Sequence, residues 1–470
     1  MKIYNINTII LSKRKCSFLF TIILFALFQM SVVSCSDFVE VEPPKNTLVS
    51  QTVFEDASTV ESALANLYEM LRGQGIGTYS LSADMGIYSD ELDYFLADPN
   101  DLSIYIHNIL PINESVSKYW VNAYRVIYSA NAIVEGVESS EGLTSVEKSE
   151  FMGQALFVRA YVHSILVGIY GDIPYITTTD YRINNSVARL PGHEVYYHII
   201  TDLMMAVDML GTTDATGEKV IPNRHVANAL LSRIYLYTGN WEQANATATQ
   251  LIDAFILEPE LEKVFLKGSR ETIWQLMPEG VDRKNAPEAN LFVILAIPGQ
   301  QYALTETLLK AFEEGDLRRE EWVGSFTSND GATTLQFPYK YKATLSETES
   351  LEYSIVFRLA EQYLIRAEAR AHMGNLTGAR QDLDTIRQRA GLDGTSAMDK
   401  ETLLEAIQAE RFTELFAENG HRWFDLKRSG KAGEVLSTIK PNWKPTHVVW
   451  PIPENELEIN PNLRPQNEGY

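Results

Sequence analysis

The chain contains two copies of one helix–turn–helix plan, and this repeat limits the folds open to it. The two copies read LLSRIYLYTGNWEQANATATQLI and IRAEARAHMGNLTGARQDLDTIR, and they match at Gly239-Asn240 with Gly374-Asn375, at Ala244 with Ala379 and at Leu251 with Ile386. In each copy the glycine can end the first helix by taking a positive φ, and the asparagine can cap the second helix. The repeat therefore predicts pairs of antiparallel helices.

This unit resembles a tetratricopeptide repeat, a helical hairpin that stacks on its neighbours. Helical patterns begin at Phe54, and apolar periodicity predicts further helices at 114–137, 146–170, 193–210, 223–238, 240–256, 304–314, 356–373, 375–390 and 401–418. Strand-like runs are few and short. We therefore expect a mainly α fold over residues 51–470, with tetratricopeptide-like hairpins as the scaffold, long irregular ligand-binding loops and an irregular insert at about 260–350.

Charge and cysteine content restrict the function classes. The net charge of −22 argues against nucleic acid as a partner, because phosphates would be repelled. The only cysteines are Cys16 and Cys35, and Cys16 lies in a leader segment, so no disulfide is expected in the mature protein. Burial of a hydrophobic core must then hold the fold together, which 470 residues permit.

The first 35 residues have the pattern of a lipoprotein signal peptide. Lys13-Arg14-Lys15 precedes an apolar run from Ser17 to Gln29, which is shorter than the ~20 residues of a membrane-spanning helix. Val32-Val33-Ser34-Cys35 resembles a lipobox, which implies removal of residues 1–34 and lipidation of Cys35. A plain signal peptide with an incidental cysteine is the alternative. Residues 35–50 hold two prolines and are predicted to be the linker behind the lipid anchor.

Signatures of catalysis and metal binding are scarce. His193 and His198 are one residue too far apart to share a helix face as the two ligands of a zinc site do. The nucleophile-elbow pattern of serine hydrolases does not occur. The 62 acidic residues leave an acid pair for glycoside hydrolysis open as an alternative, but no pattern singles one out. We therefore expect no catalytic residue, no metal and no cofactor.

A charged cluster near the C-terminus could be either an active site or a structural network. It consists of Glu410, Arg411, Glu414, Arg422 and Asp425. Glu410 and Glu414 share a helical face, and the spacing of Arg422 and Asp425 predicts a pair across one turn. We favour a buried ion network that locks packed helices together.

The irregular regions 72–112 and 278–345 are where we expect the ligand. Sugar rings stack their apolar faces on aromatic planes, and small-ligand sites combine such surfaces with a few polar groups. The candidate ligand-binding residues are Tyr88, Tyr94, Tyr105, Tyr302, Trp322 and Tyr339. Each of them could instead pack in the core, as predicted for Trp120, Trp274 and Trp423. On this division, Trp322→Ala should weaken ligand binding and Trp423→Ala should lower stability.

The C-terminal quarter and three other landmarks resemble one protein family. The landmarks are AERFTELFAENGHRWFDLKR with WPIPENELEINPNLRPQNEGY, the helix from Trp120 to Asn131, RAYVHSILVGIYGDIPY and LLKAFEEGDLRR. Together they resemble the SusD/RagB family of nutrient-binding outer-membrane lipoproteins. Ala417-Glu418-Asn419-Gly420 departs from the Phe-Glu-Gly type of run that the family often has there.

The resemblance implies a fold and a function for the chain. It implies four tetratricopeptide-like hairpins on one side, with the ligand held by irregular loops on the other. It also implies a lipid-anchored protein on the outer surface of the outer membrane, which captures oligosaccharide and passes it to a TonB-dependent, SusC-like transporter without catalysis. A peptide-capturing RagB-type protein is one alternative, and a lipid-anchored glycosidase is another.

Overall fold

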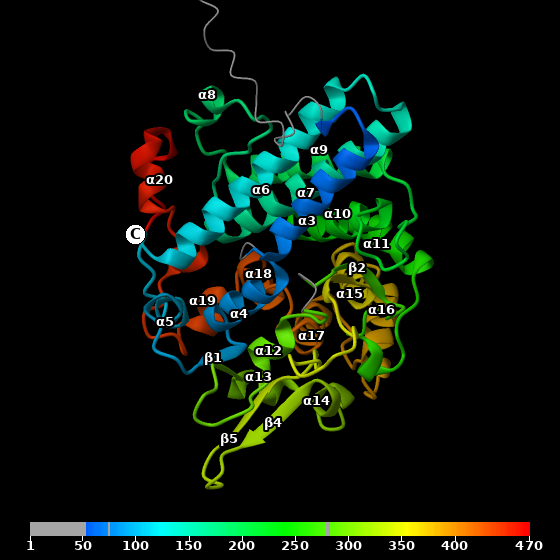
Figure 1. Ribbon diagram of the computed structural model, residues 1–470. Helices are drawn as coiled ribbons and strands as arrows, with labels where there is room; N and C mark the ends of the chain where they lie inside the picture. The colour runs from blue at the N-terminus through cyan, green and yellow to red at the C-terminus, as the bar shows by residue number, and fades with distance from the viewer. Residues whose placement is uncertain (1–52, 74–75, 279–282) are drawn as a thin grey trace, which may run out of the picture. The chain divides into compact units, whose positions relative to one another are not determined.

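The long helices pack one on the next in a continuous array (Figure 1). The computed structural model describes residues 53–73, 76–278 and 283–470. The array runs through α6 (Glu114–Ser139), α7 (Ser145–Tyr170), α9 (Gly192–Met209), α10 (Arg224–Tyr237), α11 (Trp241–Ala254), α15 (Leu359–His372), α16 (Leu376–Arg389) and α17 (Lys400–Glu414). The prediction of a mainly α fold is confirmed. The predicted signal peptide, Cys35 and the linker lie outside the described residues.

Helix α7 is the most deeply buried member of the array. Its first turn is closed by a capping box in which Thr144 and Glu147 each accept from the other's backbone N–H. Among the described helices it alone has the length and apolar composition of a membrane span, and 89% of that stretch is buried inside the protein. A helix that is apolar on all sides belongs in a core, so α7 is the central helix around which α6 and α9 pack.

The two repeated hairpins have the predicted turn. Gly239 and Gly374 adopt φ of +73° and +84°, in the left-handed region that favours glycine. Asn375 caps α16, because its Oδ1 accepts from Gly378 N at 3.0 Å. The equivalent expectation for Asn240 is wrong, because its side chain instead donates to Thr238 Oγ1 at 2.7 Å. The matched alanines are fully buried where the helices cross.

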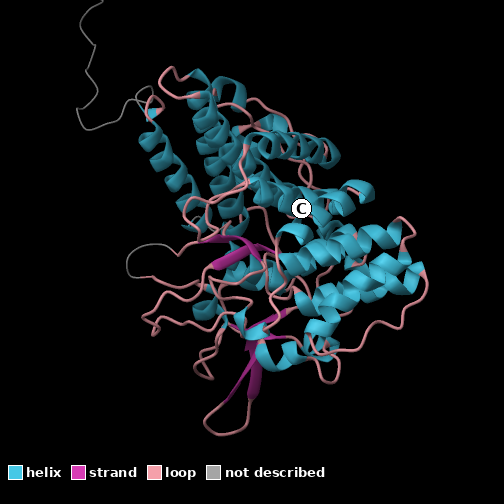
Figure 2. Cartoon of the chain, turned by 90° about the vertical axis from the view of Figure 1, so that its right-hand side faces the viewer, coloured by secondary structure: helices cyan, strands magenta, loops and turns pink. Residues whose placement is uncertain are grey.

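The irregular insert leaves the array after α11 and returns at α15, although these two helices pack directly on each other. Its elements are η1 (Leu261–Lys263), β2 (Thr272–Leu276), α12 (Glu288–Phe292), β3 (Tyr302–Leu304), α13 (Glu306–Ala311), α14 (Leu317–Glu321), β4 (Val323–Thr327), β5 (Thr334–Pro338) and β6 (Ser354–Arg358). The hairpin of β4 and β5 projects away from the helices (Figure 2). Helices predicted at 304–314 and 356–373 start later than expected, because their first residues pair as strands β3 and β6.

The remaining elements flank the array at both ends of the chain. They are α3 (Ala57–Gly73), α4 (Thr78–Tyr88), β1 (Leu92–Tyr94), α5 (Pro99–Tyr105), α8 (Tyr181–Asn184), α18 (His421–Arg428), α19 (Ala432–Leu436), η2 (Pro445–Val448), α20 (Glu454–Ile459) and η3 (Pro461–Leu463). Helix α3 packs on α6 and α7, and α18 packs on α4. The predicted core tryptophans Trp120, Trp274 and Trp423 are all buried.

The charged cluster is a buried ion network, as the sequence favours. Glu414 is fully buried and accepts from three arginines, Arg318, Arg358 and Arg389. Arg318 Nη1 also contacts Glu410 Oε1 at 2.6 Å. The network therefore ties the insert, α15, α16 and α17 together through charges that have no access to water.

One predicted pair in this region is wrong. Arg422 does not pair with Asp425 across a helical turn, and its guanidinium binds Asp90 with two bonds of 2.7 Å. Asp425 accepts instead from Arg411 Nε at 2.7 Å and Arg428 Nε at 2.8 Å. Because α18 packs on α4, a carboxylate distant in sequence displaces the local partner.

Candidate ligand-binding site

The two irregular regions of the sequence meet in one small sheet. Strand β1 pairs antiparallel with β3, with Leu92 opposite Leu304 and Tyr94 opposite Tyr302. The pairing continues past the strand end, since Phe95 N donates to Gln301 O at 3.0 Å. The sheet thus places Phe95 beside Gln301, the last residue of the loop 293–301 that leads into β3.

Three of the predicted tyrosines gather at this sheet. The ring centroid of Tyr94 lies 5.7 Å from that of Tyr302 and 6.5 Å from that of Tyr105. Tyr105 donates its hydroxyl to Asp93 Oδ1 at 2.9 Å, and Lys440 Nζ lies 4.1 Å from its ring centroid. The three rings therefore form a rigid base, but Tyr94 and Tyr302 are buried and offer little surface to a ligand.

The exposed apolar surface is supplied by neighbours of these tyrosines. Phe95 and Leu96 each keep 43% of their surface exposed, and Leu295 in the adjoining loop keeps 74%. We use the name β1–β3 face for Phe95 and Leu96 after β1 together with Leu295, Gln300 and Gln301 of the loop before β3. Leu96 and Leu295 were missed from the sequence, where the only signal is the apolar pair Phe95-Leu96 shortly before the helix start at Asp98-Pro99.

Three aspartates lie in the segments on either side of β1. Asp98 caps α5 by accepting from Asn100 N at 2.9 Å, and Tyr94 Oη lies 3.4 Å from Asp101 Oδ2. Burial raises the pKa of Tyr94 to about 12, so its hydroxyl stays protonated. Burial also raises the pKa of Asp84 to about 7, although the hydrogen bond from Tyr119 at 2.8 Å lowers it. Asp84 can therefore be protonated at neutral pH. Only Asp98 is exposed beside Phe95 and Leu96, where it can accept a hydrogen bond from a ligand hydroxyl, whereas Asp84 is bonded to Tyr119.

Besides the buried Tyr94 and Tyr302, two more of the predicted ligand-binding residues are core residues. Tyr88 is fully buried and donates its hydroxyl to His447 O at 2.7 Å. Trp322 is 1% exposed, and its Nε1 donates to Leu261 O at 3.1 Å. Neither presents a surface that a ligand could touch, so the prediction is corrected for both. Tyr339 is half-buried beside Phe337, next to β3 but outside the tyrosine group.

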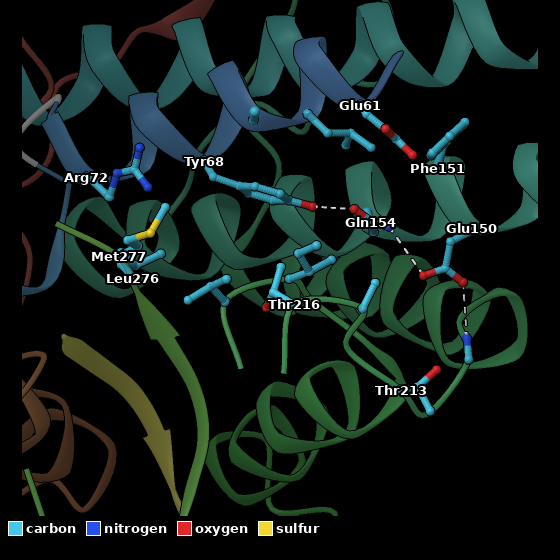
Figure 3. Close-up of a pocket in the computed structure, with 16 residues that line it drawn as sticks. Glu61, Tyr68, Arg72, Glu150, Phe151, Gln154, Thr213, Thr216, Leu276 and Met277 are labelled. Atoms are coloured by element: carbon cyan, nitrogen blue, oxygen red, sulfur yellow. Dashed lines mark hydrogen bonds between the residues drawn. The ribbon is translucent and has the colours of Figure 1, made fainter. Parts of the chain in front are cut away.

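A second candidate location is a cavity of about 640 Å³ between α3 and α7 (Figure 3). The loop 211–221 and the end of β2 complete its walls, and we call it the α3–α7 cavity. Its lining includes the buried apolar side chains of Leu64, Phe151 and Leu276. The loop is held in place because Trp274 Nε1 donates to Val220 O at 3.1 Å and Gln275 N donates to Lys219 O at 3.0 Å. The cavity is therefore preformed.

A row of hydrogen bonds lines one wall of the α3–α7 cavity (Figure 3). Tyr68 Oη donates to Gln154 Oε1 at 2.5 Å, and Gln154 Nε2 donates to Glu150 Oε1 at 3.3 Å. Gly211 N donates to Glu150 Oε2 at 3.3 Å. Burial, with Glu150 nearby, raises the pKa of Tyr68 well above its ordinary value, so this hydroxyl remains a donor. The wall is polar and other lining side chains are apolar, which suits an amphiphilic ligand.

Within the described ranges, no group of three or more His, Cys, Asp or Glu side chains is placed to hold a metal ion. His193 and His198, whose spacing argues against a zinc site, both lie on α9, where the ring of His198 stacks on Tyr175 with centroids 5.0 Å apart. The strongest assembly of charges is the Glu414 network, whose members neutralise one another in the core.

Two family models match the chain. The model described as "Starch-binding associating with outer membrane" matches residues 37–236, and the model described as "SusD family" matches residues 322–470. The chain belongs to the SusD/RagB family. Neither model covers residues 237–321, the part of this SusD-like chain that holds β3 and Leu295.

Individual SusD-like proteins are similar along most of the chain. The SusD-like protein P25 of Formosa agariphila is 25% identical and aligns with 96% of this chain and 99% of its own length. A SusD superfamily protein from Bacteroides vulgatus has a TM-score of 0.78 at 21% identity, covering 89% of this chain and 100% of that structure. A laminarin-binding SusD-like protein has a TM-score of 0.75 at 23% identity, covering 89% and 100%. These structures share the fold.

Proposed function

We propose that this SusD-family chain binds an oligosaccharide on the β1–β3 face. The observation that carries the proposal is the pairing of β1 with β3, which joins the two irregular regions into one surface. That surface exposes Phe95 and Leu96 beside the Asp98 carboxylate and glutamines, the combination that an apolar sugar face and its hydroxyls require. The similarity to a laminarin-binding SusD-like structure supports the same ligand class.

The cellular setting is part of the proposal. The lipobox-like sequence at Cys35 supports a lipid anchor, and the family model that matches residues 37–236 is described as associating with the outer membrane. In this setting the chain captures oligosaccharide at the cell surface and delivers it to a TonB-dependent, SusC-like transporter. Its role is binding without catalysis.

The first test is a binding screen of residues 36–470, the mature protein without the predicted lipidated Cys35. Starch- and laminarin-derived oligosaccharides and other neutral glycans are titrated by calorimetry, alongside pools of short peptides. We expect saturable binding to at least one glycan and no release of reducing sugar over prolonged incubation. Failure of every glycan to bind would contradict the proposal, and release of reducing sugar would favour the glycosidase alternative.

The α3–α7 cavity favours a second candidate, capture of a short peptide. Arg72 lies at one end of the cavity, while Glu150 and Glu61 lie toward the other (Figure 3). Opposite charges at the two ends of a partly apolar cavity complement a zwitterionic peptide with apolar side chains. If this candidate is right, a peptide pool binds in the same screen. Glu150→Gln then lowers the affinity for peptide and leaves the affinity for glycan unchanged.

A further inference from the structure

A cavity of about 490 Å³ lies where the segment after α5 meets the C-terminal part of the chain. Residues 107–111 form one side, and residues 441–447 with Gly469 and Tyr470 form the other. We call it the His107 cavity. No residue of the β1–β3 face is among the described residues that line it.

His107 is held in an unusual conformation at this cavity. Its φ of +56° is rare for a residue other than glycine, and such conformations persist where the surrounding structure enforces them. The ring stacks on Tyr88 with centroids 3.9 Å apart, and Nε2 lies 2.7 Å from Tyr88 O. Because the carbonyl can only accept, Nε2 must carry the proton, which leaves Nδ1 as an acceptor.

That acceptor has no donor among the described residues. Burial lowers the pKa of His107 to about 3, outweighing the bond to Tyr88, so the ring stays neutral and Nδ1 stays unprotonated. His447, whose ring centroid lies 5.9 Å away, is 4% exposed, and its Nδ1 likewise lacks a partner in the described part of the chain. Buried polar atoms are nearly always hydrogen-bonded, so two unpaired nitrogens at one cavity indicate that water or a ligand hydroxyl completes them.

The rest of the lining indicates what kind of ligand fits. Trp443 is half-buried, with its ring centroid 5.2 Å from that of His107, and Tyr470 stacks on His447 at 5.6 Å. Asn108 and Lys444 are exposed at the rim. No Asp or Glu side chain is among the lining residues that the structure describes, which disfavours a cationic ligand. An uncharged sugar ring has one apolar face, which can stack on Trp443. It also has several hydroxyls, which can form hydrogen bonds with the Asn108 amide and the two imidazoles.

We propose that the His107 cavity is a second saccharide-binding site, which takes one pyranose ring against Trp443. The ligand class rests on the proposed function, since both sites would take sugar, but the contacts are separate from the β1–β3 face. In this site the apolar face of the sugar covers the Trp443 indole. Its hydroxyls bond to Asn108 and Lys444 at the rim and reach toward the His107 imidazole.

The site can be observed directly through its tryptophan. The chain has seven tryptophans, so an NMR spectrum of the mature protein with ¹⁵N-labelled indoles contains few indole N–H signals. The signal that is missing from the spectrum of Trp443→Phe is that of Trp443. Titration with glucose, galactose, mannose, xylose and N-acetylglucosamine is expected to shift the Trp443 signal saturably with at least one sugar. The Trp241 signal serves as the internal control, because this residue stacks on His372 at a helical turn, 3.9 Å between centroids.

Variants that leave the core intact locate the binding. Asn108→Ala and Lys444→Ala each remove an exposed side chain at the rim. Each is expected to lower the affinity for the sugar that shifts the Trp443 signal by about five- to tenfold, the effect of one lost hydrogen bond. Phe95→Ala should leave this shift unchanged.

The outcomes separate the two proposals. The second site is wrong if no sugar shifts Trp443, if neither rim variant weakens the shift, or if Phe95→Ala abolishes it. Phe95→Ala can also leave the binding of longer glycans unchanged while the Trp443 shift persists. That result supports the second site and shows that the first site is not on the β1–β3 face.

Discussion

Glu414→Ala is expected to lower the free energy of unfolding by about 3–5 kcal/mol, because it removes one partner from a buried ion network. Glu414 Oε1 accepts from Arg358 Nη1 at 2.5 Å and also binds Arg389, while Oε2 accepts from Arg318 Nη1 at 3.0 Å. All of these side chains are at most 3% exposed, so water cannot replace the lost carboxylate. Urea denaturation of the wild type and the variant at neutral pH measures the difference.

The control for this prediction is an exposed ion pair. Glu434→Ala removes the partner of Lys431, in a pair whose side chains are 69% and 55% exposed, and little change in stability is expected because water screens such pairs. If Glu414→Ala costs no more than Glu434→Ala, the network does not stabilise the fold as argued.

The same network predicts a pH dependence with a definite sign. Burial alone would raise the pKa of Glu414, but Arg389, Arg358 and Arg318 outweigh it and hold the pKa far below the ordinary 4.5. When folding lowers the pKa of a carboxylate, the group stabilises the fold fully at a pH above its unfolded-state pKa. This stabilisation is lost as the pH falls below the unfolded-state pKa toward the folded-state pKa. The stability difference between the wild type and Glu414→Ala should therefore shrink progressively below about pH 4.5.

Trp322→Ala is expected to destabilise the protein by about 3–5 kcal/mol, as for other large core side chains. The ring packs against Phe265 with centroids 5.4 Å apart, Lys340 Nζ lies 4.8 Å from its centroid, and its indole N–H is bonded to Leu261 O. Truncation leaves a cavity and removes one of the two hydrogen bonds that Leu261 O accepts, leaving only the one from Val264 N. The loss should be comparable to that from Trp423→Ala, which removes another buried indole, and thermal or urea denaturation of both variants measures it.

This result reverses the role that the sequence suggests for Trp322. Phe95→Ala is the matched control, because its ring is 43% exposed and its removal should change stability little. A Trp322→Ala protein that melts like the wild type but no longer binds glycan would show that the sequence prediction was right and the assignment to the core wrong.

The helical array could be predicted from sequence because its signals are local. Apolar periodicity and the Gly-Asn turns at Gly239 and Gly374 depend on neighbours along the chain, and the observed helices lie close to the predicted ranges. What failed depends on distant contacts. Arg422 binds Asp90 instead of Asp425, and residues 356–358 join a strand instead of a helix, because partners far along the chain are available.

The candidate site was located only as a region, and the reason is physical. Aromatic side chains both fill cores and stack on ligands, and sequence spacing does not distinguish burial from exposure. Tyr94 and Phe95 are neighbours in sequence, yet one is 8% exposed and the other 43%, because Tyr94 ends the strand that packs on the core and Phe95 lies beyond it. The β1–β3 pairing that selects between them joins residues about two hundred positions apart.

Calorimetry on one double variant shows whether the ligand binds on the β1–β3 face. Phe95→Ala with Leu96→Ala removes the exposed apolar surface, and Ile459→Ala on α20, 73% exposed, is the control that removes a comparable side chain elsewhere. With the glycan found in the screen, we predict a loss of affinity of about tenfold or more in the double variant, the scale of a lost aromatic contact. The control should bind like the wild type. Unchanged affinity in the folded double variant would contradict the account.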